Sequence, residues 1–150
     1  MICRVCSGQR IEVVLDLGEQ PHCNTLTPPE HAEEDEPVYP LRLCYCHDCT
    51  TAQIDHTVPK ETMFSSYPYV SGTTQTLRDH FDDSAGRLAD RLGLGGDDLV
   101  VDIGSNDGTW LKAFAARGIR GIGVEPAENV VALARADGVE TLHRFFDAAT

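Results

Sequence analysis

The chain has 150 residues, 41% of them hydrophobic, and a formal charge of −12 at pH 7. This length suits one domain or two small ones, and the negative charge argues against a nucleic-acid partner, since phosphate contacts need clustered lysine and arginine. No apolar run approaches the roughly 18 residues of a membrane span, so no membrane partner is expected. The first residues lack the pattern of a secretory signal, which predicts a cytoplasmic protein whose thiols stay reduced.

Cysteines dominate the first third of the chain. Two pairs have the C-x-x-C spacing, Cys3 with Cys6 and Cys46 with Cys49. This spacing lets one turn of backbone present two thiolates on the same side, and two such knuckles complete a tetrahedral Cys₄ zinc site. Because protein side chains would fill all four positions, the zinc ion is predicted to be structural. Three other side chains could replace one of these ligands: Cys23, Cys44 and His47.

The segment between the cysteine pairs predicts a small β-rich subdomain. Residues Ile11–Leu17 and Tyr39–Tyr45 are expected to be strands, because apolar and polar side chains alternate along the second of them. Five acidic residues lie between Glu30 and Glu36, which indicates a solvated loop. We therefore assign residues 1–58 to a zinc-binding module.

A connector and a helix are predicted over residues 59–98. The connector includes the aromatic stretch Tyr67–Gly72. A helix is expected from Thr74 to Leu92, ended by Gly93, because apolar residues recur at helical spacing. This apolar stripe consists of Leu77, Phe81, Ala85, Leu88 and Leu92.

Residues 99–150 alternate between strand and helix patterns. The apolar run Leu99–Ile103 predicts a buried strand, followed by a glycine loop and a helix over residues 109–117. A second strand ends at Glu125, a helix follows over residues 127–136, and a third strand is expected over residues 139–142. Strands alternating with helices indicate an open α/β sheet that binds a nucleoside cofactor where the first strand ends.

The spacing of the glycine loop narrows the choice of cofactor. Its glycines follow the pattern Gly104-x-x-x-Gly108. This is not the G-x-G-x-x-G of dinucleotide-binding proteins, and no lysine follows as in a phosphate-binding P-loop. An acid two residues before G-x-x-x-G is typical of S-adenosylmethionine (SAM) methyltransferases, and an acid about 20 residues later can bind ribose hydroxyls. The predicted cofactor-binding set is Asp102, Gly104, Ser105, Asn106, Gly108 and Glu125, although Asn106 and Asp107 could instead only shape the turn.

The chain resembles the zinc-containing, SAM-dependent sugar C-methyltransferases of deoxysugar and antibiotic biosynthesis. The matching residues keep their order through nearly the whole chain: Cys3 and Cys6, Asp16-Leu17-Gly18, Gln20-Pro21, Asn24, Cys46 and Cys49, Gln53, Tyr67-x-Tyr69-x-Ser71-Gly72, His80-Phe81, Gly104–Gly108, Gly123–Pro126, Asn129 and Phe145-Phe146. The resemblance implies an α/β fold class: a small β-rich Cys₄ zinc module, then the first half of a Rossmann-like methyltransferase domain.

The resemblance also implies an activity. In this family a base removes a proton beside the keto group of a nucleotide-linked sugar, and the resulting enolate takes the methyl group of SAM. Family members are far longer, and the His and Glu groups credited with this chemistry lie beyond residue 150. The resemblance implies that Tyr67 and Tyr69 line the sugar pocket, although both could equally be packed connector aromatics. His80 is a further candidate for the substrate pocket, but a surface histidine is the simpler expectation.

Three function classes therefore remain at the level of sequence. The first is a methyltransferase, or a portion of one that is inactive alone. The second is a non-catalytic zinc-binding interaction module or accessory subunit. The intact cofactor loop counts against this class, because such a protein has no use for it. The third is a nicotinamide-binding protein, which the glycine spacing disfavours. If only three strands are present, a second chain or a missing C-terminal region must complete the sheet, and the chain alone should associate or aggregate.

Overall fold

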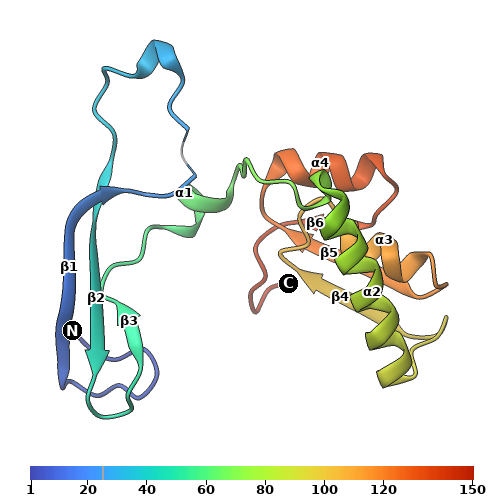
Figure 1. Cartoon of the computed structure of the whole chain (residues 1–150), viewed down its shortest axis with the longest axis horizontal. Helices are drawn as coiled ribbons and strands as arrows, with labels where there is room; N and C mark the ends of the chain where they lie inside the picture. Colours follow the sequence, from blue (N-terminus) through green and yellow to red (C-terminus); the bar gives the residue numbers. More distant parts are fainter. Residues whose placement is uncertain (25) are drawn as a thin grey trace. The chain divides into compact units, whose positions relative to one another are not determined.

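The computed structural model describes residues 1–24 and 26–150, which form two compact units, Met1–Met63 and Phe64–Thr150 (Figure 1). The first unit carries a small antiparallel sheet, and the second carries a parallel sheet with helices. The predicted α/β fold class is therefore confirmed. None of the described helices combines the length and the apolar character needed to cross a membrane.

The first unit is built on a long hairpin. Strands β1 (Ile11–Pro21) and β2 (Val38–Cys46) pair antiparallel, and β3 (Ala52–Ile54) joins the other edge of β2. A 3₁₀ turn, η1 (Pro29–His31), lies in the loop of this hairpin, and the short helix α1 (Lys60–Phe64) follows β3. Both predicted strands lie inside β1 and β2. Strand β3 was not predicted, because three residues are too few to show an alternating pattern.

A bulge bends β1 near its middle. The strand register shifts between Asp16 and Glu19, and Gly18 has a left-handed φ of 71°. The Asp16 carboxylate accepts the Gly18 N–H at 2.8 Å, while the Gln20 amide donates to the Leu17 carbonyl at 2.7 Å. A bulge leaves backbone N–H and C=O groups without partners on the neighbouring strand. The side chains of Asp16 and Gln20 provide partners for two of these groups. The residues Asp16, Gly18 and Gln20 therefore have a shared structural role.

The second unit alternates helix and strand. After η2 (Ser71–Thr73), the order is α2 (Gln75–Leu92), β4 (Leu99–Ile103), α3 (Thr109–Ala115), β5 (Arg120–Glu125), α4 (Glu128–Ala136) and β6 (Thr141–His143). The three strands are parallel in the order β4-β5-β6, and their carboxyl ends meet at one edge of the sheet. Helix α2 begins after the Thr74 cap and ends at Gly93, whose φ of 65° satisfies a left-handed C-cap.

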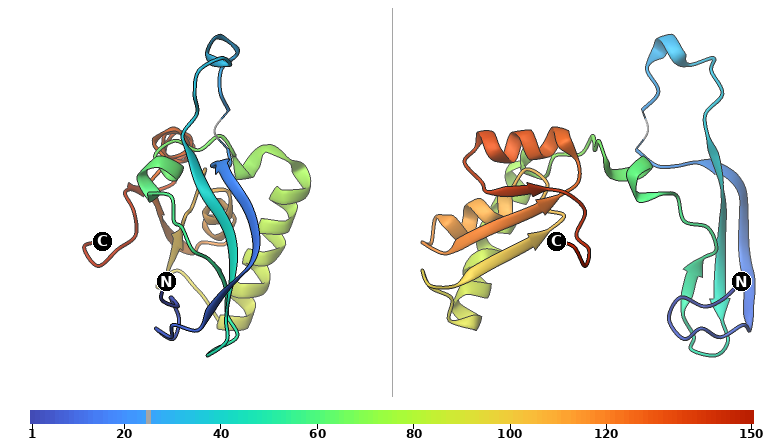
Figure 2. Two further views of the ribbon diagram at one scale, coloured as in Figure 1. Left: turned by 90° about the vertical axis from the view of Figure 1, so that its left-hand side faces the viewer. Right: turned by 180° about the vertical axis from the view of Figure 1, so that it is seen from behind.

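The helices pack against one face of this sheet. Ala85 of α2 lies in a core cluster with Phe114 of α3, and Val100 of β4 packs against it. Val100 also contacts a second cluster that joins α3 to α4 through Leu111 and Ala134. Figures 1 and 2 show α2 crossing this side of the strands.

The opposite face of β4 is open. Its side chains Leu99, Val101 and Ile103 are 56%, 48% and 57% exposed, and within the described chain β4 pairs only with β5. Three apolar residues in a row on one uncovered strand face form a continuous apolar surface. This surface, together with the unpaired edge of β4, is what a sheet lacking further strands should present.

Candidate metal centre and cofactor loop

The first cysteine knuckle is closed by its own backbone. The Ser7 N–H donates to the Cys3 carbonyl at 3.0 Å, and the Cys3 N–H donates to the Gly8 carbonyl at 2.9 Å. Ser7 has a left-handed φ of 61°, which turns the chain back beneath the sulfurs. The Gly8 N–H then points at Cys6 Sγ at 3.4 Å, a contact that stabilises a thiolate.

The second knuckle repeats this arrangement. Thr50 donates its N–H to the Cys46 carbonyl at 2.8 Å, and the Cys46 N–H donates to the Thr51 carbonyl at 2.9 Å. Thr50 has a φ of 63°, the counterpart of Ser7. Cys49 Sγ lies 3.2 Å from Thr51 Oγ1, and hydrogen bonds with Thr51 first, and then with Cys6 and Cys3, lower the pKa of the Cys49 thiol to about 6. The two C-x-x-C segments thus form a matched pair.

The four cysteines fit a zinc ion. Their sulfur atoms all lie within 4.8 Å of one another, and Cys3 and Cys49 Sγ are 3.6 Å apart. Cys6 and Cys46 Sγ are 3.7 Å apart. Tetrahedral zinc with Zn–S bonds of about 2.3 Å places its sulfurs about 3.8 Å apart. A disulfide would need about 2.05 Å, so these spacings match metal coordination rather than a covalent bond.

The three alternative ligands lie outside this cluster. Cys44 is fully buried in β2 and makes only a 3.9 Å contact with the Arg42 carbonyl. His47 directs Nε2 to the Glu12 carboxylate at 2.9 Å, and Cys23 is exposed. The structure therefore brings together the four residues of the two C-x-x-C pairs.

The glycine loop connects β4 to α3 with a backbone that needs left-handed residues. Gly104, Asn106 and Gly108 have φ values of 76°, 52° and 72°. The Gly104 N–H donates to the Val124 carbonyl of the neighbouring strand at 2.8 Å, which fixes the loop at the carboxyl edge of the sheet. At Gly108 a Cβ atom would lie 2.8 Å from Val139, so only glycine fits there.

Glu125 lies beside this loop, where the sequence predicted it. Its carboxylate accepts the Asn106 N–H and the Ala127 N–H, each at 2.9 Å, and the residue is only 7% exposed. A carboxylate has about four acceptor sites, so two sites remain for ligand hydroxyls. Glu125 therefore also holds two backbone segments together, a role that the sequence did not indicate.

Asp102 brings a second acid to the same edge. Burial raises the pKa of its carboxyl, and the charge of Glu125 raises it further. Two neighbouring acids favour a ligand that carries positive charge or hydroxyl donors.

The loop also has room for a ligand. Apart from the two chain neighbours of Gly104, no atom of the described residues lies within 4 Å of where a side chain at residue 104 would begin. The buried Ser105 hydroxyl has no hydrogen-bond partner in the same part of the chain. Gly123 allows Ser105 to lie close to β5, because a Cβ at residue 123 would collide with it. A polar cofactor approaching the Gly104 backbone fits these features.

The aromatic connector is held against the loop by amide side chains. Asn129 accepts the Tyr67 N–H at 3.0 Å and donates to the Tyr67 carbonyl at 2.7 Å. Asn106 accepts the Ser71 N–H at 2.9 Å and donates to the Tyr69 carbonyl at 3.0 Å. Both amide groups are thus engaged with backbone, which supports the turn-shaping alternative for Asn106.

Asp107 completes this attachment. Its carboxylate accepts the Gly72 N–H at 3.1 Å and the Thr109 hydroxyl at 2.8 Å. A side chain at residue 72 would collide with Asp107 and Thr109, so the close approach of the connector to the glycine loop requires glycine there. These contacts could not be predicted from local sequence patterns, because they join segments about 35 to 60 residues apart.

The three substrate-pocket candidates have different surroundings. Tyr67 is half-buried, with its ring centroid 6.1 Å from that of Phe64, and Tyr69 is 50% exposed. His80 is exposed on α2, and its ring centroid lies 5.9 Å from that of the neighbouring Phe81. Tyr67 and Tyr69 therefore lie on the tethered connector, whereas His80 does not.

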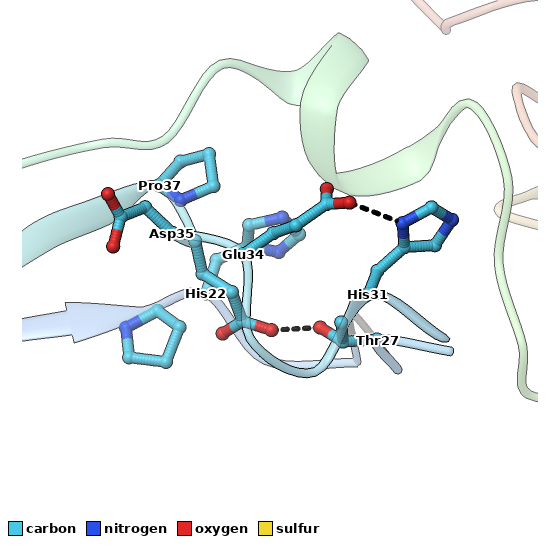
Figure 3. Close-up of a pocket in the computed structure, with 8 residues that line it drawn as sticks. His22, Thr27, His31, Glu34, Asp35 and Pro37 are labelled. Carbon is cyan, nitrogen blue, oxygen red and sulfur yellow. Dashed lines mark hydrogen bonds and ion pairs between the residues drawn. The ribbon is translucent and has the colours of Figure 1, made fainter. Parts of the chain in front are cut away.

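The acidic segment of the hairpin loop encloses a small pocket of about 160 Å³. Figure 3 shows the His31 ring pointing to Glu34, with Nδ1 2.7 Å from the carboxylate, and the Thr27 hydroxyl bonded to Glu36. All five acids from Glu30 to Glu36 are exposed, as expected for a solvated loop.

The chain is related to known proteins. Residues 3–64 match the family described as "Putative zinc binding domain". C-methyltransferase NovU from Streptomyces niveus is 32% identical over 146 residues, which is 97% of this chain and 35% of that protein. The chain thus spans about a third of the length of this curated relative. A solved SAM-dependent methyltransferase from Archaeoglobus fulgidus aligns with 45% of this chain and 30% of its own, at 23% identity and a TM-score of 0.33.

Zinc and SAM, the two predicted cofactors, agree with these relationships and with the four-cysteine cluster. The predicted resemblance to the zinc-containing methyltransferases is thereby confirmed.

Proposed function

We propose that this chain provides the zinc module and the SAM-binding edge of a C-methyltransferase that acts on a nucleotide-linked keto-deoxysugar. The observation that carries the proposal is the pairing of the glycine loop with Glu125. Its carboxylate lies 2.9 Å from the Asn106 N–H, at the carboxyl ends of two adjacent parallel strands. Ligands of open α/β sheets bind at this edge.

The charges at this edge support SAM over other nucleoside cofactors. SAM carries a sulfonium and an amino group, whereas nicotinamide dinucleotides carry phosphates. Asp102 and Glu125 offer negative charge at this edge. This charge disfavours a phosphate-bearing cofactor and favours the cationic SAM.

The proposed reaction is a transfer of a methyl group to carbon. A base removes the proton from the carbon beside the sugar keto group, and the electron pair of that C–H bond forms an enolate. SAM, held by the glycine loop, Asp102 and Glu125, would supply the electrophilic methyl group that the enolate carbon takes up, and S-adenosylhomocysteine would be the by-product.

The base is proposed to come from outside residues 1–150, either from a further region of the polypeptide or from a second chain. Tyr67 and Tyr69 are proposed to face the sugar. Their connector is fixed to the glycine loop through Asn106 and Asn129, so cofactor and sugar would be positioned by one structure. The chain alone is then expected to be inactive.

The zinc ion is proposed to be held by Cys3, Cys6, Cys46 and Cys49 in a structural role, with no open position for substrate. A cytoplasmic location forms part of this proposal, because four free thiolates persist in a reducing compartment.

Isothermal titration calorimetry with SAM tests the proposal, with Asp102→Asn as the decisive variant. The substitution removes a charge that burial and Glu125 disfavour, so the free protein should become more stable while SAM binds less tightly. A matched control is Asp98→Asn, an exposed acid before the same strand. Saturable SAM binding that weakens only in Asp102→Asn is expected, whereas the absence of SAM binding by folded protein would refute the proposal.

One observation favours an accessory role as second candidate. The uncovered side chains of β4 are suited to binding another protein, which an accessory subunit would do without catalysis. An accessory subunit has no need of SAM, so the same titration separates the two candidates.

A further inference from the structure

The connector segment, residues 65–72, lies against loops at the carboxyl edge of the parallel sheet. In the chain it runs from the end of α1 towards α2 (Figure 1). None of its side chains is fully buried. Because burial of apolar surface stabilises this segment only weakly, its order depends on the hydrogen bonds that attach it to the rest of the second unit.

The first attachment point is the beginning of α4. The Asn129 amide accepts the Tyr67 N–H at 3.0 Å and donates to the Tyr67 carbonyl at 2.7 Å. The Glu128 N–H donates to the Ser65 carbonyl at 3.2 Å. Three hydrogen bonds thus fix the first half of the connector segment to two consecutive residues of one helical turn.

The second attachment point is the glycine loop. The Asn106 amide accepts the Ser71 N–H at 2.9 Å and donates to the Tyr69 carbonyl at 3.0 Å, and the Asp107 carboxylate accepts the Gly72 N–H at 3.1 Å. Asn106 and Asp107 are only 8% and 6% exposed. Detachment of the connector segment would take protein partners from both of these nearly buried side chains, which is unfavourable.

One carboxylate joins the two attachment points. Glu125 Oε2 accepts the Asn106 N–H and Glu125 Oε1 accepts the Ala127 N–H, each at 2.9 Å. Asn106 belongs to the second point, and Ala127 is the N-cap of α4, two residues before Asn129. A ligand that fixes the orientation of the Glu125 carboxylate therefore fixes the backbone at both attachment points.

The backbone of Asn106 makes this dependence mutual. Its φ of 52° lies in the left-handed region, which residues other than glycine adopt at a cost in free energy. The connector segment binds its side chain and Glu125 binds its N–H, so both keep Asn106 in this conformation. Without the connector segment, the glycine loop would be freer to leave the conformation that the structure shows.

We propose that Asn106 and Asn129 are positioning residues that couple cofactor binding at Glu125 to the order of the connector segment. The inference rests on the proposed function, in which SAM binds beside Glu125. The cofactor and the attached connector segment favour the same conformation of the glycine loop, so each strengthens the binding of the other. Tyr67 and Tyr69 are then held more firmly once the cofactor is bound, which favours binding of cofactor before substrate.

Hydrogen exchange of the zinc-loaded full chain, with and without saturating SAM, tests this coupling. SAM should slow exchange of the Tyr67, Ser71 and Gly72 amides about fivefold, the lower end of typical coupling between two sites. Exchange of the amides in β2 of the zinc module should not change. The comparison needs no substitution, so it stands even if a variant fails to fold.

Asn129→Asp is the decisive variant. Its carboxylate still accepts the Tyr67 N–H but cannot donate to the Tyr67 carbonyl, which it repels. A negative charge in the first turn of α4 favours the helix and attracts a cation, so neither effect would weaken SAM binding. SAM affinity should nevertheless fall about threefold, a part of the full coupling. The slowing of exchange by SAM should be lost at Tyr67 and retained at Ser71, which Asn106 still holds.

Glu128→Gln is the matched control, because it changes one charge in the same turn and leaves the Asn129 amide in place. Its SAM affinity and its connector exchange should match those of the unmodified protein. If SAM binds without slowing connector exchange, or binds folded Asn129→Asp as tightly as the unmodified protein, the inference is overturned while the proposed function stands. If the folded, unmodified protein does not bind SAM at all, both are refuted.

Discussion

Glu125 is predicted to stabilise the second unit through its two backbone partners. In Glu125→Ala, the N–H groups of Asn106 and Ala127 lose their acceptor in a site where the carboxylate is 7% exposed. A buried donor left without a partner costs about 1–3 kcal/mol, so two donors predict a loss of about 2–6 kcal/mol. Domains of this kind have only about 5–15 kcal/mol of total stability.

The assay is thermal unfolding followed by circular dichroism, with Glu128→Ala as control because Glu128 is exposed three residues further along. Even the lower estimate of 2 kcal/mol corresponds to a fall in melting temperature of about 8 °C or more. Glu125→Gln keeps one acceptor oxygen and should lose about half as much stability. A shift in Glu125→Ala no larger than that of the control would refute the reasoning that Glu125 joins β5 to the glycine loop.

The remaining predictions concern the metal, the second acid, the connector and the open sheet. Metal analysis should find one zinc per chain, lost in Cys46→Ser and retained in Cys44→Ser; the reverse order would show that the wrong cysteine was assigned. Because the pKa of Asp102 is raised above the ordinary value of 3.8, the carboxyl favours folding only while protonated, and this contribution is lost as pH rises through the folded pKa. Asp102→Asn should therefore raise the melting temperature at pH 7 but not below pH 3.8, and equal gains at both pH values would contradict this. Asn129→Ala should speed hydrogen exchange at Tyr67 but not within the zinc module, whereas unchanged exchange at Tyr67 would remove Asn129 from that role. Light scattering should show association or aggregation of the chain alone through the open face of the sheet, and a stable monomer would contradict it.

Elements that depend on local patterns were predicted well. Helix α2 was expected to begin near Thr74 and to end at Gly93, and both positions cap it. The C-x-x-C spacing identified all four clustered cysteines because each knuckle closes through hydrogen bonds within six residues. These sequence patterns involve residues that are close together in the chain, so they can be recognised without knowledge of the fold.

Features that depend on distant contacts could not be predicted. Glu125 was expected to serve only a ligand, but its two backbone partners were invisible until β4 and β5 were placed side by side. Asn129 matched the family pattern, but nothing in the sequence connected it to Tyr67, whose N–H it accepts.

The four-cysteine cluster has a consequence for how the first unit unfolds. The ion would connect sulfurs 46 residues apart at Cys3 and Cys49, and 40 residues apart at Cys6 and Cys46. A cross-link that encloses so long a loop removes much conformational entropy from the unfolded chain. Loss of the metal would therefore open most of Met1–Met63 at once, so that cellular zinc supply determines how much of this module is exposed to proteases.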